Sequence, residues 1–430
     1  MRLSRHWRGR LKTLTLVAAA FAGGAASSSF VHARSENSSP YAPLGQMARV
    51  LVYLENSYVE AVERDEILTG AVRGMVAQLD PHSAYMTPEE FEQFNEDTEG
   101  SFGGIGVEVD FRDEQVIVIA PIPETPAFRA GIKSGDIIAA VDGKPLRGLS
   151  PDKIIPLMRG PEGSTIALTI RRPPEREPRV IKLKREFIHI RSVDGKRLRG
   201  DVAYFRLKQF QQNSHRELLE SVAAVRESSP APLQGVILDM RSNPGGLIHE
   251  AEGIANEMLD GGGIYSTRHR GKVVEKVDAH RGGALSRLPL VVLVDEYSAS
   301  SSELVAGALQ DAGRATIIGA TTFGKGSVQT IFQLPGGAGL RLTTMRYYTP
   351  KGFAIQGAGV TPEIRIKYKE DDERGGGIAI REKDLEGSLE AENRRRQRTK
   401  KTVVGEKRPT YTPIDKVPVD PAQGADFGLR

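Results

Sequence analysis

The sequence of 430 residues contains no cysteine. It can therefore form no disulfide bond, no thiolate nucleophile and no cysteine-ligated zinc site. It also lacks the cysteine that a lipid-modified signal requires. A chain of this length can bury a core large enough to fold without cross-links. These absences fit an exported protein of a bacterial envelope, if another feature indicates export.

Metal and nucleotide motifs are missing as well. The eight histidines include no H-E-x-x-H arrangement, so we predict no metal site and no cofactor. The segment Gly319–Gly326 is one residue short of a Walker A loop, and Gly326 stands where a serine or threonine would hold magnesium. The next residues, 327–332, have the pattern of a strand instead of the required helix. We therefore predict no nucleotide ligand.

The chain has little net charge once its N-terminus is set aside. Residues 1–33 combine five basic residues, an apolar run from Leu14 to Ala26 and the A-x-A-like end Val31-His32-Ala33, which indicates a secretory signal. Its removal changes the formal net charge from +4 to −1, which argues against a nucleic-acid binder. We expect a protein of the periplasm or cell envelope. The alternative for residues 1–33 is an uncleaved membrane anchor.

Residues 34–99 follow the signal as a predicted helical module. Apolar residues keep a helical period from Leu44 to Leu79, with breaks near Ser57 and Arg64. Another helix is expected after Thr87-Pro88, an N-cap followed by proline at the first helical position. Packing or dimerisation is the simplest role for such a module.

Residues 100–187 resemble a PDZ domain, a small β-sandwich. The resemblance lies in the glycine-rich Gly103-Gly104-Ile105-Gly106-Val107 and in the passage Ala130–Gly143, which contains A-G-I-K-S-G-D and a D-G turn. In such domains an extended peptide adds to an edge strand, and free N–H groups of the glycine-rich loop capture its terminal carboxylate. We therefore predict peptide binding at Gly103, Gly104, Ile105, Gly106 and Val107. A plain hairpin turn is the alternative for the loop alone.

Residues 188–368 alternate strands with helices, which predicts an α/β core with layered helices. Strands are expected at 202–207, 235–240, 290–294 and 315–318, and helices at 214–225 and 247–259. Residues 369–430 are poor in apolar residues and rich in charge, and we expect a largely disordered tail.

Ser300 follows one of these strands. Val291–Val294 is a buried strand, and the apolar residues 304–309 begin a helix, so Ser300 is expected at a strand-to-helix junction, where the helix N-terminus favours developing negative charge. This position suits a nucleophile. Ser300-x-x-Glu303 also matches a capping box, which would give the serine a structural role.

Lys325 lies between two glycines and is the candidate base for that serine. Glycines allow close approach of the backbone and burial of the amine, and burial lowers the pKa of a lysine toward the range in which it can accept a proton. An ion-paired structural lysine is the alternative. The segment Asp239–Gly246 supplies glycine amides at a helix start, which suit an oxyanion, although a simple helix-entry turn has the same pattern.

Together these segments resemble the carboxyl-terminal processing (tail-specific) proteases, serine endopeptidases with a PDZ domain inserted before a crotonase-like core. The matching motifs are Asp239–Gly246, Tyr297–Glu303, Thr322–Gln329 and Arg346–Pro350 with Ile355-Gln356-Gly357. The resemblance covers about residues 42–390.

The resemblance implies roles for individual residues. Ser300 is the expected nucleophile, Lys325 the general base, Gln329 the residue that orients the lysine, and Gly246 with the amide of Ser301 the oxyanion hole. Arg159, within Leu157–Gly160, is the expected switch between peptide binding and the active site. Two departures stand out: Ser301 replaces the usual alanine, and the tail lacks the expected apolar C-terminal helix, which puts oligomerisation through that end in doubt.

We therefore predict an exported serine endopeptidase that cleaves proteins near free C-terminal tails, with an activating adaptor protein and a homo-oligomer as further partners to test. The alternative from another class is a PDZ peptide-binding adaptor on an inactive hydrolase core. A third reading, an S-x-x-K acyltransferase, rests on Ser150–Lys153, which we expect to be a loop, and it lacks a K-T-G partner motif.

Overall fold

A computed structural model describes residues 41–112, 114–175, 177–366 and 380–389. The predicted signal, residues 34–40 of the predicted helical module and most of the predicted tail lie outside these residues. Within them, every helix is too short or too polar to cross a membrane. The described residues divide into two compact units between Met75 and Val76.

The first unit holds two helices, α2 (Ala42–Ser57) and α3 (Arg64–Ala77, whose last two residues belong to the second unit). The helix breaks predicted near Ser57 and Arg64 are confirmed, because α2 ends at Ser57 and α3 begins at Arg64. Helix α2 has no buried residue, and its apolar Leu44, Met47 and Val50 are 54%, 41% and 55% exposed. This leaves an apolar helix face open to solvent.

The second unit begins with a turn, the short strand β1 (Ala84–Met86) and helix α4 (Pro88–Glu99). Thr87 caps α4, as predicted, and does so in a reciprocal box with Glu90; Gly100 ends the helix in a left-handed conformation. Strand β1 pairs with the core strand β18 (Gly339–Tyr348), so residues 84–86 belong to a core sheet.

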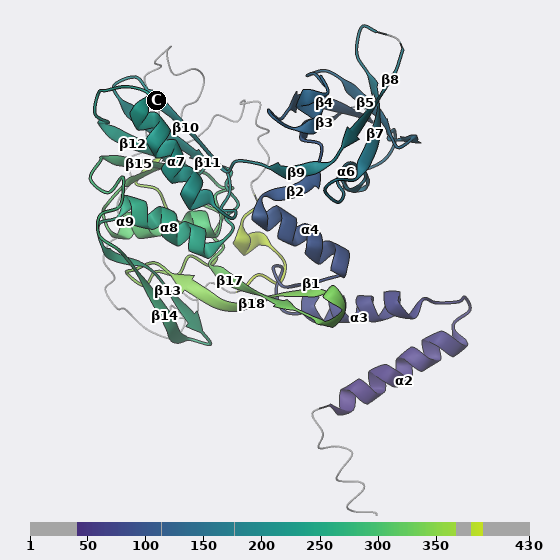
Figure 1. Cartoon of the computed structure of the whole chain (residues 1–430). Helices are drawn as coiled ribbons and strands as arrows, with labels where there is room; N and C mark the ends of the chain where they lie inside the picture. Colours follow the sequence, from purple (N-terminus) through teal and green to yellow (C-terminus); the bar gives the residue numbers. More distant parts are fainter. Residues whose placement is uncertain (1–40, 113, 176, 367–379, 390–430) are drawn as a thin grey trace, which may run out of the picture. The chain divides into compact units, whose positions relative to one another are not determined.

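The PDZ-like segment has one large sheet and one small one. The large sheet has the order β3-β4-β5-β7-β8, with β3 as an edge strand, and β6 pairs with β5. Strands β2 and β9 form the small sheet, and helices α5 and α6 complete the segment (Figure 1). The elements are β2 (Ser101–Gly104), β3 (Val107–Arg112), β4 (Gln115–Pro121), α5 (Pro126–Arg129), β5 (Ile137–Val141), β6 (Lys144–Pro145), α6 (Pro151–Met158), β7 (Thr165–Arg171), β8 (Arg179–Lys184) and β9 (Glu186–His189).

The segment also corrects one expectation. Ser150–Lys153 is not a loop, because Ser150 is the N-cap of α6 and Pro151 opens that helix. Proline is well suited to the first helical turn, where its missing N–H is not needed.

The core contains a six-stranded sheet, β10-β11-β12-β15-β16-β19, which is parallel except for the β10–β11 pair. Its helices are α7, α8 and α9. The elements are β10 (Val193–Leu198), β11 (Val202–Leu207), α7 (Ser214–Glu227), β12 (Gly235–Asp239), α8 (Ile248–Met258), β15 (Leu290–Val294), α9 (Ser301–Asp311), β16 (Thr316–Gly319) and β19 (Ile364–Arg365). Each predicted element between 202 and 318 is present within a residue or two.

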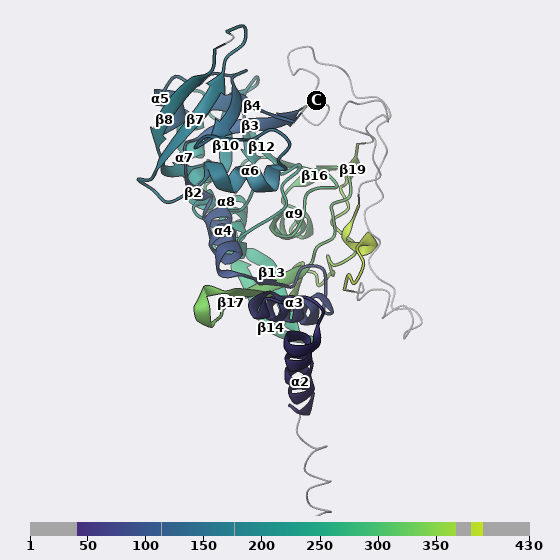
Figure 2. The same ribbon diagram turned by 90° about the vertical axis from the view of Figure 1, so that its right-hand side faces the viewer.

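A second sheet lies on the other side of helices α8 and α9. It consists of β1, β18, β13 (Gly262–His269), β14 (Lys272–Ala279) and β17 (Ser327–Gln333). Both ribbon views place α8 and α9 between the two sheets (Figures 1 and 2), and α9 contacts β13 on one side and β16 on the other. The predicted layering of helices and strands is confirmed.

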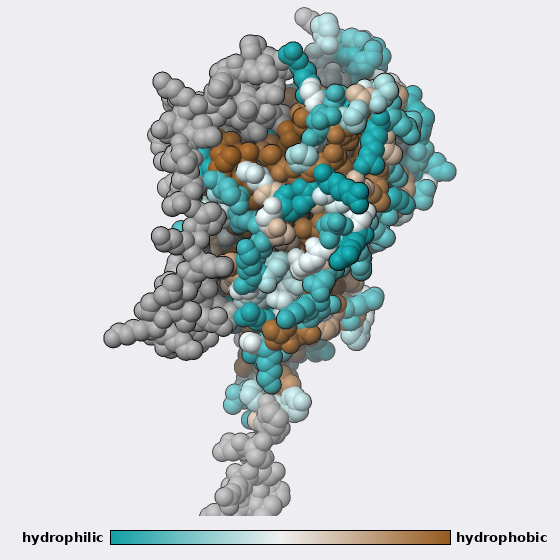
Figure 3. Space-filling model, turned by 90° about the vertical axis from the view of Figure 1, so that its left-hand side faces the viewer, coloured by the Kyte–Doolittle hydropathy of each residue, from teal (hydrophilic) through white to brown (hydrophobic). Residues whose placement is uncertain are grey.

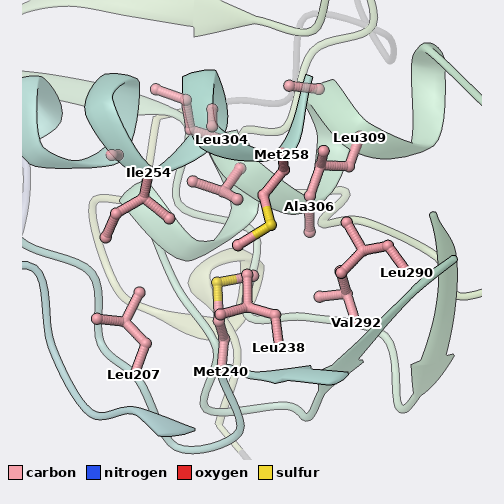
Figure 4. Packing of buried hydrophobic residues seen from close by; sticks show 14 of the residues in the cluster. Leu207, Leu238, Met240, Ile254, Met258, Leu290, Val292, Leu304, Ala306 and Leu309 are labelled. Carbon is pink, nitrogen blue, oxygen red and sulfur yellow. The ribbon is translucent and has the colours of Figure 1, made fainter. Parts of the chain in front are cut away.

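Buried aliphatic side chains fill the space between the parallel sheet and its helices. Leu238 and Val292 from the strands meet Ile254, Met258 and Leu304 from the helices (Figure 4). All of these are at most 2% exposed. On the face drawn in Figure 3, apolar patches interrupt an otherwise hydrophilic surface. This dry core fixes the ends of β12 and β15, from which the site is built.

Candidate active site

Ser300 lies at the junction between β15 and α9, as predicted. Its φ and ψ are +56° and −116°, a conformation that costs a non-glycine residue on the order of 1–3 kcal/mol. The amide of Ala299 and the hydroxyl of Ser302 both donate to the Asn243 carbonyl, each at 3.0 Å. The buried neighbours thus hold the strained serine in place.

Glu303 ties this junction to the lysine loop. Its side chain is fully buried and accepts N–H bonds from Ser300 at 2.9 Å, Gly324 at 2.7 Å and Lys325 at 2.8 Å, and a bond from the Thr322 hydroxyl. Burial raises the pKa of Glu303 to about 7, against these donors, which favour the carboxylate. One side chain therefore sets the spacing between the two segments that carry Ser300 and Lys325.

Lys325 is half-buried and lines the same cavity of about 570 Å³ as Ser300. Among the described residues no carboxylate lies within 4 Å of its amine, so the expected alternative of an ion-paired lysine finds no partner there. Burial lowers the pKa of the amine, and the positive charge of Arg341 lowers it further, while Glu382, Glu303 and Asp80 oppose this effect.

Tyr347 is a buried residue that binds the main chain of the loop carrying Lys325. It is 1% exposed, and its hydroxyl donates to the Lys325 carbonyl. Burial raises the pKa of Tyr347 well above its usual value, so the phenol stays neutral. The phenol therefore keeps its proton and donates a hydrogen bond to the Lys325 carbonyl.

The loop 239–246 is anchored by a buried carboxylate. Asp239 is 0% exposed and contacts Arg241 (Nε–Oδ1 2.9 Å), Arg206 (2.8 Å) and the Tyr204 hydroxyl (2.8 Å). Burial alone would raise the pKa of Asp239, but the hydrogen bonds and charges of the arginines outweigh it and hold the pKa below its usual value. Asp239 is thus a structural anchor for the glycines beyond it.

Those glycines lie against Ser300. A Cβ on Gly245 would come within 2.7 Å of the Ser300 Cβ, and one on Gly246 within 2.0 Å of the Phe210 carbonyl oxygen. Within the described part of the chain, the amides of Gly246 and Ser301 donate to no protein acceptor. The Ser301 hydroxyl donates to the Gly246 carbonyl at 2.8 Å. Two unused amides therefore lie beside Ser300, which is the arrangement that an oxyanion requires.

Gln329 lines the cavity, but its amide nitrogen donates to the Ser327 and Thr343 hydroxyls, at 2.9 and 3.3 Å. The described residues show no hydrogen bond between Gln329 and the Lys325 amine. The predicted orienting role of Gln329 stays a prediction. In this conformation Gln329 does not act on Lys325 through a direct hydrogen bond.

The predicted peptide-binding loop lies at the start of the edge strand β3. Carbonyl groups of Gly103, Ile105 and Gly106 accept bonds from Gly160, Ala127 and Ile122, which fixes the loop. The amides of Ile105 and Gly106 donate to no acceptor among the described residues, and Val107 begins the strand. Gly104, in β2, is buried in front of the Phe102 ring.

Arg159 ends helix α6, at the other side of the Gly103 segment. Its guanidinium stacks on the Phe102 ring at 4.4 Å and pairs with Glu96 (3.4 Å) and Asp97 (3.2 Å) of helix α4. It thus links the PDZ-like segment to the helix whose Phe94 and Thr98 line the Ser300 cavity.

The described residues include no group of three or more side chains able to hold a metal ion.

Sequence reasoning missed two residues of this site. Glu303 was expected only as the partner in a capping box, and Tyr347 only as part of a motif. The signal for both was present, since S-x-x-E and R-Y-Y-T-P were among the recognised segments. Their contacts, however, join positions more than 20 residues apart, which no local pattern encodes.

Comparison with known proteins supports the same assignment. Residues 201–366 match the model of peptidase family S41, residues 117–172 match a PDZ domain, and residues 16–90 match the N-terminal domain of the activating protease CtpB. A carboxy-terminal-processing protease of Bartonella bacilliformis is 39% identical over 352 residues, which are 81% of either chain.

Two further matches have lower sequence identity. A probable CtpA-like serine protease of Staphylococcus aureus is 36% identical over 333 residues, 77% of this chain and 66% of the relative. Among solved structures, a photosystem II D1 C-terminal processing protease is 28% identical, with a TM-score of 0.46 over 77% of this chain and 88% of the other.

The fold, the site and these matches define a serine-type peptidase with a PDZ domain. More narrowly, the chain belongs to peptidase family S41 and is a carboxy-terminal-processing protease of that family.

Proposed function

We propose that this protein is a Ser300–Lys325 endopeptidase of the bacterial envelope that cleaves proteins near C-terminal tails bound by its PDZ domain. One observation carries the proposal. Ser300 and Lys325 line one cavity, with two unused backbone amides beside the serine and no carboxylate paired with the lysine among the described residues.

The chemistry is acyl transfer. The neutral Lys325 amine removes the proton from the Ser300 hydroxyl as its oxygen attacks the scissile carbonyl. The negative charge that forms on the carbonyl oxygen is bound by the amides of Gly246 and Ser301. The lysine then gives its proton to the leaving amine. Water, activated by the same lysine, hydrolyses the acyl-enzyme.

The PDZ domain supplies substrate selection. The exposed edge of β3 pairs with an extended tail, and the amides of Ile105 and Gly106 bind its terminal carboxylate. Arg159 relays binding to the active site, since its partners Glu96 and Asp97 belong to the helix that contributes Phe94 to the cavity. An activating adaptor and a homo-oligomer through the exposed face of α2 are further partners in this proposal.

The remaining elements of the proposal concern fold and location. The core is crotonase-like, with α8 and α9 enclosed between two sheets, and residues 34–99 act as a helical module. Residues 1–33 direct export. Fractionation of cells expressing the full chain tests the location, and an uncleaved N-terminus in the membrane fraction would replace the cleaved signal by an anchor.

The test of the activity uses purified wild-type protein beside the Ser300→Ala and Lys325→Met variants. Each is incubated with an unstructured protein that ends in an apolar tail, and with the same protein carrying a C-terminal amide. Mass spectrometry should find cleavage by the wild type only, and faster cleavage of the free-acid substrate.

Equal cleavage by wild type and Ser300→Ala would remove the proposed nucleophile. Binding of the tail with no cleavage by any variant, in the presence of envelope extract as a source of activator, would favour the peptide-binding adaptor instead.

A further inference from the structure

Arg341 is a second cation in the cavity of Ser300 and Lys325. It lies on β18, opposite Ala84 of β1. Its Nε donates to the His82 carbonyl at 3.0 Å, and its guanidinium carbon lies 5.8 Å from the centre of the Phe94 ring. No salt bridge to Arg341 is formed by the described residues. The charge of Asp80 nevertheless acts on Arg341 and opposes the effect of burial on its pKa.

Three carboxylates also act on Lys325, and each is occupied by other donors. Asp80 accepts from the Ser83 hydroxyl at 2.7 Å and from Thr343 at 3.0 Å. Glu382 is fully buried and contacts His82 at 2.7 Å and Gln356 at 2.6 Å. Glu303 binds the donors described above. None of these carboxylates forms an ion pair with the Lys325 amine, although the charge of each still raises its pKa.

Building on the proposed dyad, we propose that Arg341 is a positioning residue whose positive charge keeps the Lys325 amine unprotonated and thus able to act as the base. The guanidinium lines the cavity of the amine, and the 80–83 turn and Phe94 fix it there. Burial and the like charge of Arg341 both lower the pKa of Lys325, whereas Glu382, Glu303 and Asp80 raise it. The family motifs identified in the sequence give Arg341 no role.

The test is the pH profile of kcat/KM for Arg341→Met and Arg341→Lys. The acid limb reports protonation of the base in the free enzyme. Loss of the positive charge in Arg341→Met should move this limb to higher pH, with activity on the limb falling by about tenfold and the high-pH plateau unchanged. Arg341→Lys keeps the charge and should keep the wild-type limb.

Two further variants control the experiment. Arg346→Met removes the same charge from the same strand but lies at another cavity, and it should leave the limb in place. Glu382→Gln removes a charge of opposite sign and should move the limb to lower pH, which keeps the proposal testable if Arg341→Met does not fold. An unmoved limb in Arg341→Met, an equal shift in Arg341→Lys, or a loss that is equal at every pH would each overturn the role.

A measurement without catalysis separates this role from the proposed dyad. Competitive acetylation of Lys325 with acetic anhydride, followed by mass spectrometry in a Ser300→Ala background, titrates the amine directly. Arg341→Met should raise the pH at which Lys325 becomes reactive, and an unchanged titration would refute the role. If Lys325→Met stays active, the dyad fails, while the acetylation result still decides whether Arg341 sets the charge of the amine.

Discussion

Two loops meet at the cavity, and each carries a buried charged side chain. In one loop this side chain is ion-paired, whereas in the other it has no ion-pair partner among the described residues. In the loop 239–246, Asp239 is surrounded by Arg241, Arg206 and Tyr204. In the loop 322–326, the Lys325 amine contacts no carboxylate among the described residues, while Glu303 and the Tyr347 hydroxyl bind its main chain. A fully paired buried charge stabilises structure, whereas a buried amine without a partner is costly to fold and available for chemistry.

The largest expected effect tests the unpaired side of this comparison. Lys325→Met should lower kcat/KM by about 10³-fold or more, because serine is a poor nucleophile without a base. Its free energy of unfolding at pH 7 should stay the same or rise, since no ion pair is lost. Peptidase assays with thermal unfolding provide both numbers. A clear loss of stability would make Lys325 a structural residue.

Substitution of the ion-paired Asp239 should have the opposite effect on stability. Asp239→Asn leaves Arg241 and Arg206 without their buried counter-charge and should lower the free energy of unfolding by about 3–5 kcal/mol. Urea titration measures this change, with Asp110→Asn on the exposed strand β3 as a control that should shift little. If Asp239→Asn is as stable as the wild type but inactive, the carboxylate has a direct catalytic part that the contacts do not indicate.

The pH dependence of stability sharpens the contrast further. The pKa of Lys325 is lowered in the folded state, so the unfolded chain binds more protons, and stability should rise with pH toward the ordinary lysine pKa near 10.5. The slope for this one group is at most about 1.4 kcal/mol per pH unit. The difference in unfolding free energy between wild type and Lys325→Met isolates it. A difference that does not vary with pH would mean that the folded amine titrates normally.

The smallest expected effect concerns the hydrogen bond between the Ser301 side chain and the Gly246 carbonyl, which joins the two residues that carry the unused amides. Ser301→Ala removes a hydroxyl that donates to the Gly246 carbonyl. A net contribution of about 1 kcal/mol is typical of such a bond, so kcat should fall less than tenfold with KM unchanged. Ser302→Ala is the matched control for stability, since its hydroxyl binds Asn243 instead. A loss as large as that of Lys325→Met would show that the Ser301 hydroxyl itself takes part in the reaction.

Much of the candidate site could be predicted from the amino-acid sequence. The aliphatic run before Ser300, the glycines around Lys325 and the D-x-R-x-N-P-G-G segment each mark a strand end or a loop, because local periodicity and turn residues depend on neighbours in sequence. The helix breaks near Ser57 and Arg64 and the capped start of α4 were predictable for the same reason. The family motifs added the roles of Ser300, Lys325 and Gly246.

Other features could not be predicted, because they depend on contacts between distant segments. Nothing in S-x-x-E indicates that Glu303 binds the amides of Gly324 and Lys325, and nothing near Gln329 indicates that its amide turns to Ser327 and Thr343. Local sequence pattern was enough to assign Ser300 and Lys325 to their strand-to-helix junction and loop. Burial of Lys325, the lack of a counter-charge at its amine among the described residues and the approach of Arg341 all depend on how the two sheets pack against α8 and α9, since the charge state of an amine depends on everything that surrounds it.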